Sequence, residues 1–123
     1  MAQLFLAIAA VLGGLSVAGG AFATHALESR LSDRAIEIFE TGARYQMYHA
    51  LALLLVALLL RNGPSPWLTA AGVAFVAGVA VFSGSLYALS LSGIKILGAI
   101  TPLGGAAFLL GWGCLLGAAL TLK

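Results

Sequence analysis

Charged residues are scarce in this chain of 123 residues, because Asp, Glu, Lys and Arg together make up only 8%. Soluble domains carry about 25%. The scarcity excludes a soluble fold of this length, since a small domain leaves much of its surface in water. The six basic residues are scattered, with no basic run and no interleaved aromatic residues, which excludes a nucleic-acid-binding surface.

Groups that carry chemistry are also few. Cys114 is the only cysteine, so no intrachain disulfide can form, and in an apolar segment we expect it to be a small packing residue. The sequence has no phosphate-binding glycine loop, HExxH, CxxC or nucleophile elbow. No carboxylate lies in the middle of an apolar run, which argues against a proton-coupled multidrug transporter. We therefore expect no enzymatic activity, no resident cofactor and no metal site.

Apolar residues are abundant: they make up 62% of the chain, and the mean hydropathy is +1.09. A helix that crosses a bilayer needs about 20 mostly apolar residues. Four such runs fit, at about 4–24, 45–61, 67–91 and 96–122. The sequence therefore predicts one integral-membrane domain over residues 1–123, an all-α four-helix transmembrane bundle in a lipid bilayer.

The stretch 32–61 is charged in its first half and almost pure hydrocarbon in its second half. It predicts one helical segment, or two with a hinge at Gly42, and Ser32 or Asp33 is a suitable N-cap. One face carries Ala35, Ile36, Phe39 and Ala43, and the opposite face carries Asp33, Glu37, Glu40 and Arg44. We predict a short amphipathic interfacial helix over about 33–44, with Glu40 and Arg44 paired at i,i+4. A solvated helix that only connects two spans is the plainer alternative.

Small residues form a stripe along the first span. Ala9, Gly13, Ser16 and Gly20 share one side of a helix, and the other side carries Leu4, Ile8, Val11, Leu15 and Phe22. Small residues let two helix backbones approach closely in lipid. We predict that the small face packs against a neighbouring helix and that the bulky face meets lipid or fills a groove. Further Gly/Ala-rich faces, including the GxxxG of residues 113–117, extend this expectation to self-association or to partner membrane proteins.

The distribution of Lys and Arg predicts the orientation, because these residues are enriched on the cytoplasmic side. Arg30, Arg34, Arg44 and Lys95 lie on one side, and Arg61 and Lys123 lie on the other. Because four of these basic residues lie on the first side and two on the second, we expect the amphipathic segment in the cytoplasm and both termini outside.

Two histidines are the first candidate ligands. His25 ends the first span and His49 begins the second, so we expect both near the same interface. Two imidazoles at matched depth on adjacent helices can ligate a haem iron or a metal. The plainer alternative is that each imidazole forms a hydrogen bond with a nearby carbonyl or headgroup.

A polar ring is the second candidate, formed by Arg44, Tyr45, Gln46, Tyr48 and His49. Such a ring can hold a quinone headgroup or a lipid phosphate, or it can be an interfacial aromatic belt. The candidate binding residues are therefore His25, His49, Arg44 and Tyr45. More broadly, residues 22–49 retain both histidines, all four acids and three of the six basic residues, so we expect the function at this end.

Three blocks of the sequence resemble a known family. Residues 20–27 (GAFATHAL) resemble the GAFGAHAL-type signature of the small four-span membrane proteins collected as domain of unknown function 423, and blocks within 39–51 and 98–105 resemble its second and third signatures. The chain departs at Ala23 and Thr24, where the family tends to have Gly and Ala, which alters the surroundings of His25. The resemblance implies four helices and a bacterial inner-membrane location, and it supplies no activity from which a catalytic residue could be assigned.

Three functions are open at this point. Abundant helix-packing surface with little chemistry favours a non-enzymatic accessory or scaffolding component of a membrane assembly. The first alternative is an interfacial haem, metal, quinone or lipid site that uses His25 and His49. The second is a small-solute channel or transporter, although nothing in the sequence resembles a selectivity filter.

Overall fold

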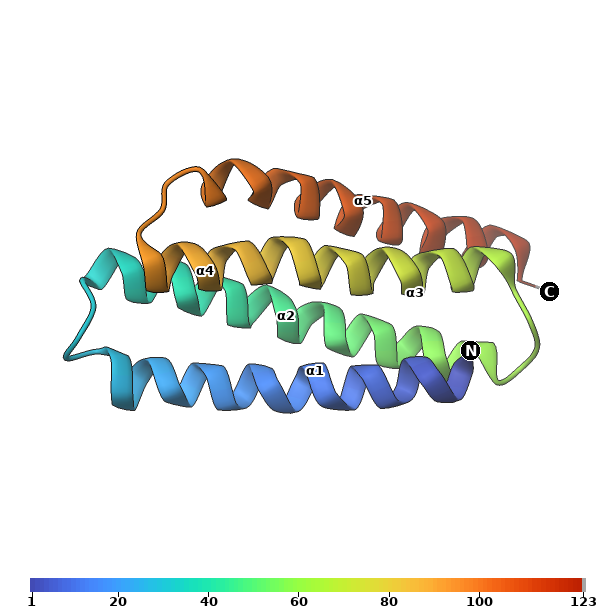
Figure 1. Cartoon of the computed structure of the whole chain (residues 1–123). Coiled ribbons are helices and arrows are strands. Elements are labelled where there is room, and N and C mark those ends of the chain that lie inside the picture. Colours follow the sequence, from blue (N-terminus) through green and yellow to red (C-terminus); the bar gives the residue numbers. More distant parts are fainter. Residues whose placement is uncertain (123) are drawn as a thin grey trace.

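The four apolar runs form four long helices in a computed structural model, which describes residues 1–122 (Figure 1). Helix α1 (Ala2–Phe22) continues through a π-helical turn, η1 (Ala23–Leu27), and α2 spans Asp33–Leu60. The third long helix consists of α3 (Pro66–Gly78), the π-helical turn η2 (Val79–Ser83) and α4 (Gly84–Ser92), and α5 (Leu97–Thr121) is the fourth. Each of the four is long and apolar enough to cross a membrane. The predicted all-α four-helix architecture is confirmed.

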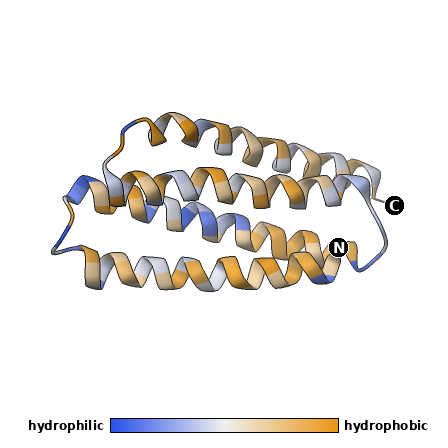
Figure 2. Ribbon diagram, in the orientation of Figure 1, coloured by the Kyte–Doolittle hydropathy of each residue, from blue (hydrophilic) through white to orange (hydrophobic). Residues whose placement is uncertain are grey.

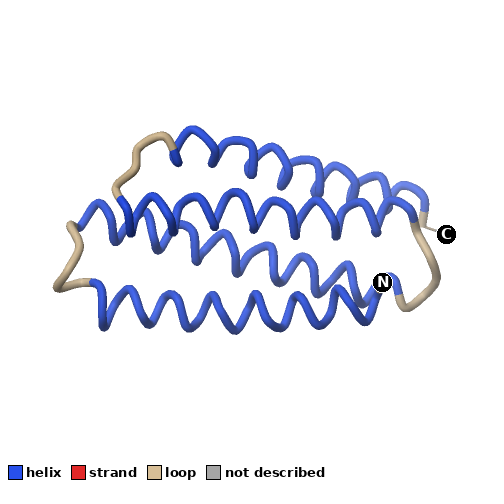
Figure 3. Tube along the Cα trace, viewed as in Figure 1, coloured by secondary structure: helices blue, strands red, loops and turns tan. Residues whose placement is uncertain are grey.

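The helices alternate in direction, and α2 and the third helix lie between α1 and α5 (Figure 1). The connections are short, over residues 28–32, 61–65 and 93–96 (Figure 3). The first and third of these lie at one end of the bundle, and the second lies at the other end with the two termini. Arg30 and Lys95 therefore share one end, as the orientation count assumed, whereas Lys123 lies outside the described residues.

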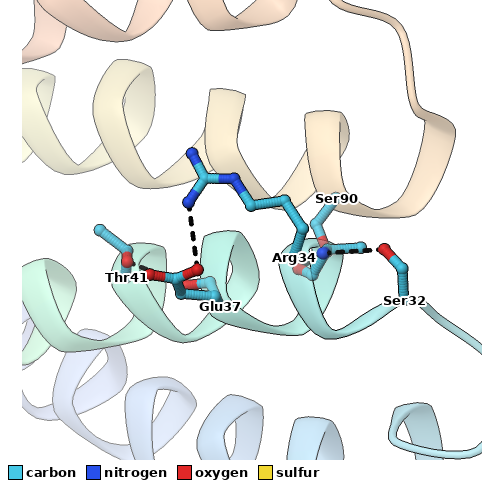
Figure 4. A network of polar contacts seen from close by, with 6 residues as sticks. Ser32, Arg34, Glu37, Thr41 and Ser90 are labelled. Carbon is cyan, nitrogen blue, oxygen red and sulfur yellow. Dashed lines mark hydrogen bonds and ion pairs between the residues drawn. The ribbon is translucent and has the colours of Figure 1, made fainter.

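Helix α2 is continuous, so residues 33–44 are its first turns and not a separate interfacial helix before a span at 45–61. The Ser32 side chain caps it by accepting the Ala35 N–H at 3.1 Å (Figure 4). Gly42 is not a hinge: it stays helical and lets α4 approach, because a Cβ there would lie 2.9 Å from Tyr87 Cε1. Hydrophilic residues gather in these first turns, and the remainder of the helix is mostly apolar (Figure 2).

The predicted faces of this segment are confirmed, because Phe39 and Ala43 are buried and Arg44 is exposed. The predicted Glu40–Arg44 pair is wrong. In residues 1–122 the ion pair that forms is Arg34 Nη1 to Glu37 Oε2 at 3.1 Å (Figure 4). An exposed i,i+4 pair gains only about 0.3 kcal/mol, too little to hold two long side chains in one geometry.

Helix α1 follows its predicted faces. Ala9 and Ser16 are buried against the bundle, whereas the bulky side chains are half or more exposed at Leu4, Val11, Leu15 and Phe22. The helix packs chiefly against α2. Its small residues therefore bring α1 and α2 together. Most of its large residues face outward, where lipid is the natural contact, but Phe5 is buried against Gly72 of α3 and Ile8 is half-buried against the core.

The core lies between α1, α2, α3 and α5, and its fully buried side chains include Leu53, Val56, Leu68 and Phe75. Helix α5 approaches η2 most closely at Gly104, where a Cβ would overlap the backbone nitrogen of Phe82. The two glycines of the GxxxG sequence have different surroundings: Gly117 packs against the Trp67 ring, and Gly113 faces open space.

Candidate functional site

Gln46 is a buried polar side chain that connects three helices. Its Nε2 donates to the Leu12 carbonyl of α1 at 2.8 Å, and its Oε1 accepts the Tyr87 hydroxyl of α4, also at 2.8 Å. Both ends of the amide are satisfied, so its burial in an apolar bundle is compensated. Gln46 therefore holds α1, α2 and α4 in one register.

His49 is buried one turn further along α2 and connects it to α5. The Trp112 indole N–H donates to His49 Nε2 at 3.1 Å, and Nδ1 lies 2.7 Å from the Tyr45 carbonyl oxygen. An indole nitrogen can only donate, so Nε2 must carry the lone pair and Nδ1 the proton that it donates to Tyr45. The imidazole is thus neutral with both nitrogens engaged. A metal or haem iron would need the lone pair that Trp112 already uses.

Aromatic rings surround this imidazole. Phe108 stacks on it with ring centroids 3.5 Å apart, and Phe75 and Trp112 lie at 5.5 and 5.9 Å. Trp112 itself is 46% exposed on the outer surface of α5. These aromatic rings shield the two hydrogen bonds of His49 from competing polar groups. This favours a structural role for His49 in joining α2 to α5.

His25 lies elsewhere, exposed in the turn η1. Gln46 bonds to Leu12, and Phe39 lies beside Gly19, so α1 and α2 run antiparallel with His25 near the start of α2. His49 is sixteen residues from Asp33, which places it about 24 Å further along the bundle at 1.5 Å per residue. The expectation of matched depth is wrong, because α2 begins well before the apolar run that defined the predicted span.

The predicted polar ring divides between two sides of α2. Gln46 and His49 point inward, while Arg44, Tyr45 and Tyr48 are exposed. The Tyr45 ring packs against Phe82 with a centroid distance of 4.9 Å. Successive helical residues turn by 100°, so five neighbours in sequence cannot share one site. The structure therefore brings Tyr45 and His49 together, with ring centroids 6.4 Å apart, but it does not bring His25 and Arg44 to them.

A row of hydroxyl groups that the sequence analysis missed joins α4 and η2 to α2. Ser83 donates to the Gly42 carbonyl at 2.7 Å and Ser90 donates to the Ala35 carbonyl at 2.6 Å (Figure 4 shows the Ser90 end). Tyr87 lies between them and reaches Gln46. The positions 83, 87 and 90 follow the helical repeat, which is the signal that could have revealed this face.

Two adjoining hollows mark the end of the bundle that carries most charges. The first, of about 240 Å³, is lined by all four acidic residues of the chain, Glu28, Asp33, Glu37 and Glu40. The second, of about 410 Å³, lies between α1 and α2, and we call it the α1–α2 groove; its lining includes Ser16, Gly20, Thr24, Glu40, Arg44 and Met47. Thr24 and Glu40 border both hollows. Within residues 1–122, no group of three or more His, Cys, Asp or Glu side chains is placed to hold a metal ion.

Comparison with known proteins now places the chain. The model of a family described as protein of unknown function (DUF423) matches residues 19–105. The chain belongs to the DUF423 family. No solved structure matches it.

Relatives extend over almost the whole chain. The chain is 45% identical to the UPF0382 membrane protein YwdK of Bacillus subtilis over 89% of this chain and 90% of that protein. It is 44% identical to the UPF0382 membrane protein SH2409 of Staphylococcus haemolyticus over 89% of each. It is 37% identical to the UPF0382 inner membrane protein YgdD of Escherichia coli over 98% of this chain and 92% of that protein. This DUF423 protein is accordingly an integral membrane protein, and none of these names describes an enzyme.

Proposed function

We propose that this DUF423 protein is a non-enzymatic accessory or scaffolding component of an assembly in the bacterial inner membrane. The observation that carries the proposal is an outward stripe of small side chains on α1. These residues are exposed and recur every three or four positions: Ala7, Ala10, Gly14, Ala18 and Ala21. At 100° per residue they lie opposite Ala9 and Ser16, which face α2.

This stripe has the properties of a helix-docking surface. Ala10, Gly14 and Ala18 form a small-xxx-small series, and a Cβ at Gly14 would meet no atom within 4 Å. In lipid, helices associate through close van der Waals packing, for which small residues are enriched. Since α1 packs chiefly against α2, its opposite side is available to the transmembrane helix of another protein.

The buried polar groups support a structural role. The His49 lone pair accepts from Trp112, and both ends of the Gln46 amide bond to neighbouring helices. Such bonds fix the arrangement of the helices, whereas a catalytic group needs a free lone pair or proton directed at a substrate.

Affinity purification in mild detergent, from native membranes at native expression level, tests the proposal. We expect the wild-type protein to recover a partner chain in stoichiometric amount. Gly14→Leu should abolish the recovery, because leucine fills the stripe, whereas Val11→Leu on the bulky face is the matched control and should retain it. Recovery of the protein alone, or equal recovery with both variants, would contradict the proposal.

Self-association is a separate outcome with its own measurement. In a Cys114→Ser background, Gly14→Cys places a single thiol in the stripe. If Gly14→Cys forms disulfide-linked dimers efficiently in membranes and Val11→Cys forms none, the helix that docks on the stripe belongs to a second copy of this chain.

The proposed orientation has the end with Arg30, Arg34 and Lys95 in the cytoplasm. Lys95→Cys and Asn62→Cys, each in the Cys114→Ser background, place a thiol at opposite ends of the bundle. A membrane-impermeant maleimide applied to intact spheroplasts should label the thiol at residue 62 and not that at residue 95. The reverse pattern would invert the topology.

A further inference from the structure

The α1–α2 groove is a hollow open to the outside of the bundle. Ser16 and Ala43 are buried within it, and Gly20 leaves space in its wall, since a Cβ there would meet no atom within 4 Å. The groove therefore exists because α1 offers small side chains on the flank that faces the polar half of α2.

Two opposite charges border the groove without neutralising each other. Glu40 and Arg44 lie one helical turn apart, and within residues 1–122 neither has an ion-pair partner within 4.0 Å. Their neighbours Arg34 and Glu37 are paired instead. One carboxylate and one guanidinium are thus available to an occupant of the groove.

Glu40 and Arg44 lie near the depth of the lipid headgroups. Helix α2 has 28 residues, or about 42 Å at 1.5 Å per residue, against a hydrocarbon core of about 30 Å. With Leu60 at the far boundary, the excess of about 12 Å covers the first eight residues, 33–40. Glu40 then lies at the near boundary and Arg44 just below it. Helical side chains lean toward the N-terminus, so the Arg44 side chain extends toward the headgroups.

Ser16 provides an independent sign of an occupant. It is 5% exposed, and in residues 1–122 its hydroxyl is the buried side-chain polar group without a hydrogen-bond partner. Buried hydroxyl groups in native structures are nearly always bonded. A lipid in the groove brings ester carbonyls to this depth, and these are acceptors for a serine hydroxyl.

The adjoining acidic hollow selects the type of headgroup. Glu28, Asp33 and Glu37 line it beside Glu40, so a purely anionic headgroup is repelled there and an amine is attracted. We propose that the α1–α2 groove binds a zwitterionic phospholipid with a primary amine. Its phosphate accepts from Arg44, its ammonium group donates to Glu40, and its ester region lies at Ser16.

The chemistry predicts an order among headgroups. A guanidinium binds a phosphate through two parallel N–H donors, and this contact is common to all phospholipids. An ethanolamine ammonium group adds N–H donors for the Glu40 carboxylate. A choline group has no N–H, and a glycerol group has no positive charge. Ethanolamine lipid should therefore bind more tightly than choline or glycerol lipid with the same acyl chains.

Native mass spectrometry of the purified protein, titrated with phosphatidylethanolamine, phosphatidylcholine or phosphatidylglycerol of identical chains, tests this proposal. We expect one bound phosphatidylethanolamine, with at least tenfold preference over the other two. Arg44→Gln should weaken its binding about tenfold, and Glu40→Gln should remove the preference over phosphatidylcholine. Arg61→Gln is the control, because this arginine caps the far end of the same helix, away from both hollows, and it should leave binding unchanged.

Gly20→Leu keeps the test decisive if a charge variant fails to fold. The added side chain enters open space and occupies the groove, so helicity by circular dichroism should persist while lipid binding is lost. Equal binding of the three lipids, a preference for phosphatidylglycerol, or equal effects of Arg61→Gln and Arg44→Gln would overturn the proposal. Partner recovery through the α1 stripe does not depend on this outcome.

Discussion

Helix α5 and helix α2 are attached to the third helix in different ways. Where α5 crosses η2, Gly104 lies directly against the backbone at Phe82, so this contact depends chiefly on shape, with a single hydrogen bond nearby between the Ser85 and Thr101 hydroxyls at 2.6 Å. Where α2 meets η2 and α4, hydroxyl groups of Ser83 and Ser90 donate to carbonyls of the neighbouring helix. In lipid, where burial of apolar surface does not drive helices together, close packing and interhelical hydrogen bonds are the two available means of association.

The two contacts should therefore respond differently to substitution. Where the opposing atoms of a close contact belong to backbone, they cannot move aside, so one added methyl group lowers the stability of the protein. Loss of one hydrogen bond between membrane helices lowers the free energy of unfolding only slightly, because the polar groups of the separated helix find other hydrogen-bond partners in the membrane. Four substitutions or pairs of substitutions test this difference, beginning with the backbone contact at Gly104.

Gly104→Ala should have the largest effect. The new Cβ overlaps the Phe82 backbone and must push α5 away from η2, with an expected loss of about 1–3 kcal/mol in the free energy of unfolding. Unfolding in sodium dodecyl sulfate, followed by circular dichroism, measures it. Gly113→Ala on the same helix is the control, because its Cβ enters open space. Equal stability of the two variants would show that α5 is not held by shape.

The Gln46–Tyr87 bond should come next. A double-mutant cycle of Gln46→Leu and Tyr87→Phe isolates the contribution of this bond between α2 and α4. We expect a coupling of about 0.6 kcal/mol, and at most about 1.7, as for other hydrogen bonds between membrane helices. Tyr48→Phe replaces Tyr87→Phe in the control cycle, since Tyr48 is exposed. A coupling as large as the Gly104 effect would remove the distinction between the two contacts.

Ser83→Ala removes a single donor to a carbonyl that also accepts within its own helix. The expected loss is therefore about 0.6 kcal/mol or less in the same unfolding assay. Ser92→Ala is the control, because the Ser92 hydroxyl bonds only to its own surroundings in the chain, donating to the Ala88 carbonyl and accepting the Ile94 N–H. If both serine variants lose the same stability, the cross-helix bond contributes nothing beyond its local surroundings.

Glu37→Gln should have the smallest effect. The Arg34–Glu37 pair is exposed, so its loss costs about 0.3 kcal/mol at low salt and less at high salt. Unfolding at two ionic strengths measures the difference, and Glu28→Gln, an exposed acid without an ion-pair partner in residues 1–122, is the control. An undiminished effect at high salt would mean that this pair is shielded from water.

The number of helices and the faces of α1 were predictable because each depends on local sequence. Four apolar runs of bilayer length allow four spans, and Ala9 and Ser16 recur on one side at 100° per residue. Gln46 and His49 were harder. Polar residues before an apolar run suggest an interface, yet here both lie inside the bundle because neighbouring helices satisfy them.

The partner of His49 could not be derived from the sequence. Trp112 is sixty-three positions away, and its approach depends on how α5 rotates about its axis, which Gly104 and the rings beside it determine jointly. The α1–α2 groove has the same origin. It arises where small side chains of α1 face the polar half of α2, and that pairing depends on how the two helices are rotated and aligned.

The bond between Trp112 and His49 also has a consequence for spectroscopy. The indole is 46% exposed on the outer surface while its N–H is fixed to an imidazole inside the bundle. Its fluorescence therefore reports two environments at once: acyl-chain quenchers collide with the ring from outside, and separation of α5 from α2 releases its N–H. The other tryptophan, Trp67, packs against Gly117 of the same helix α5, so its emission must be removed, and a Trp67→Phe protein then has a single built-in emitter at the α2–α5 contact. Its emission can follow the opening of that contact in a lipid bilayer without any added dye.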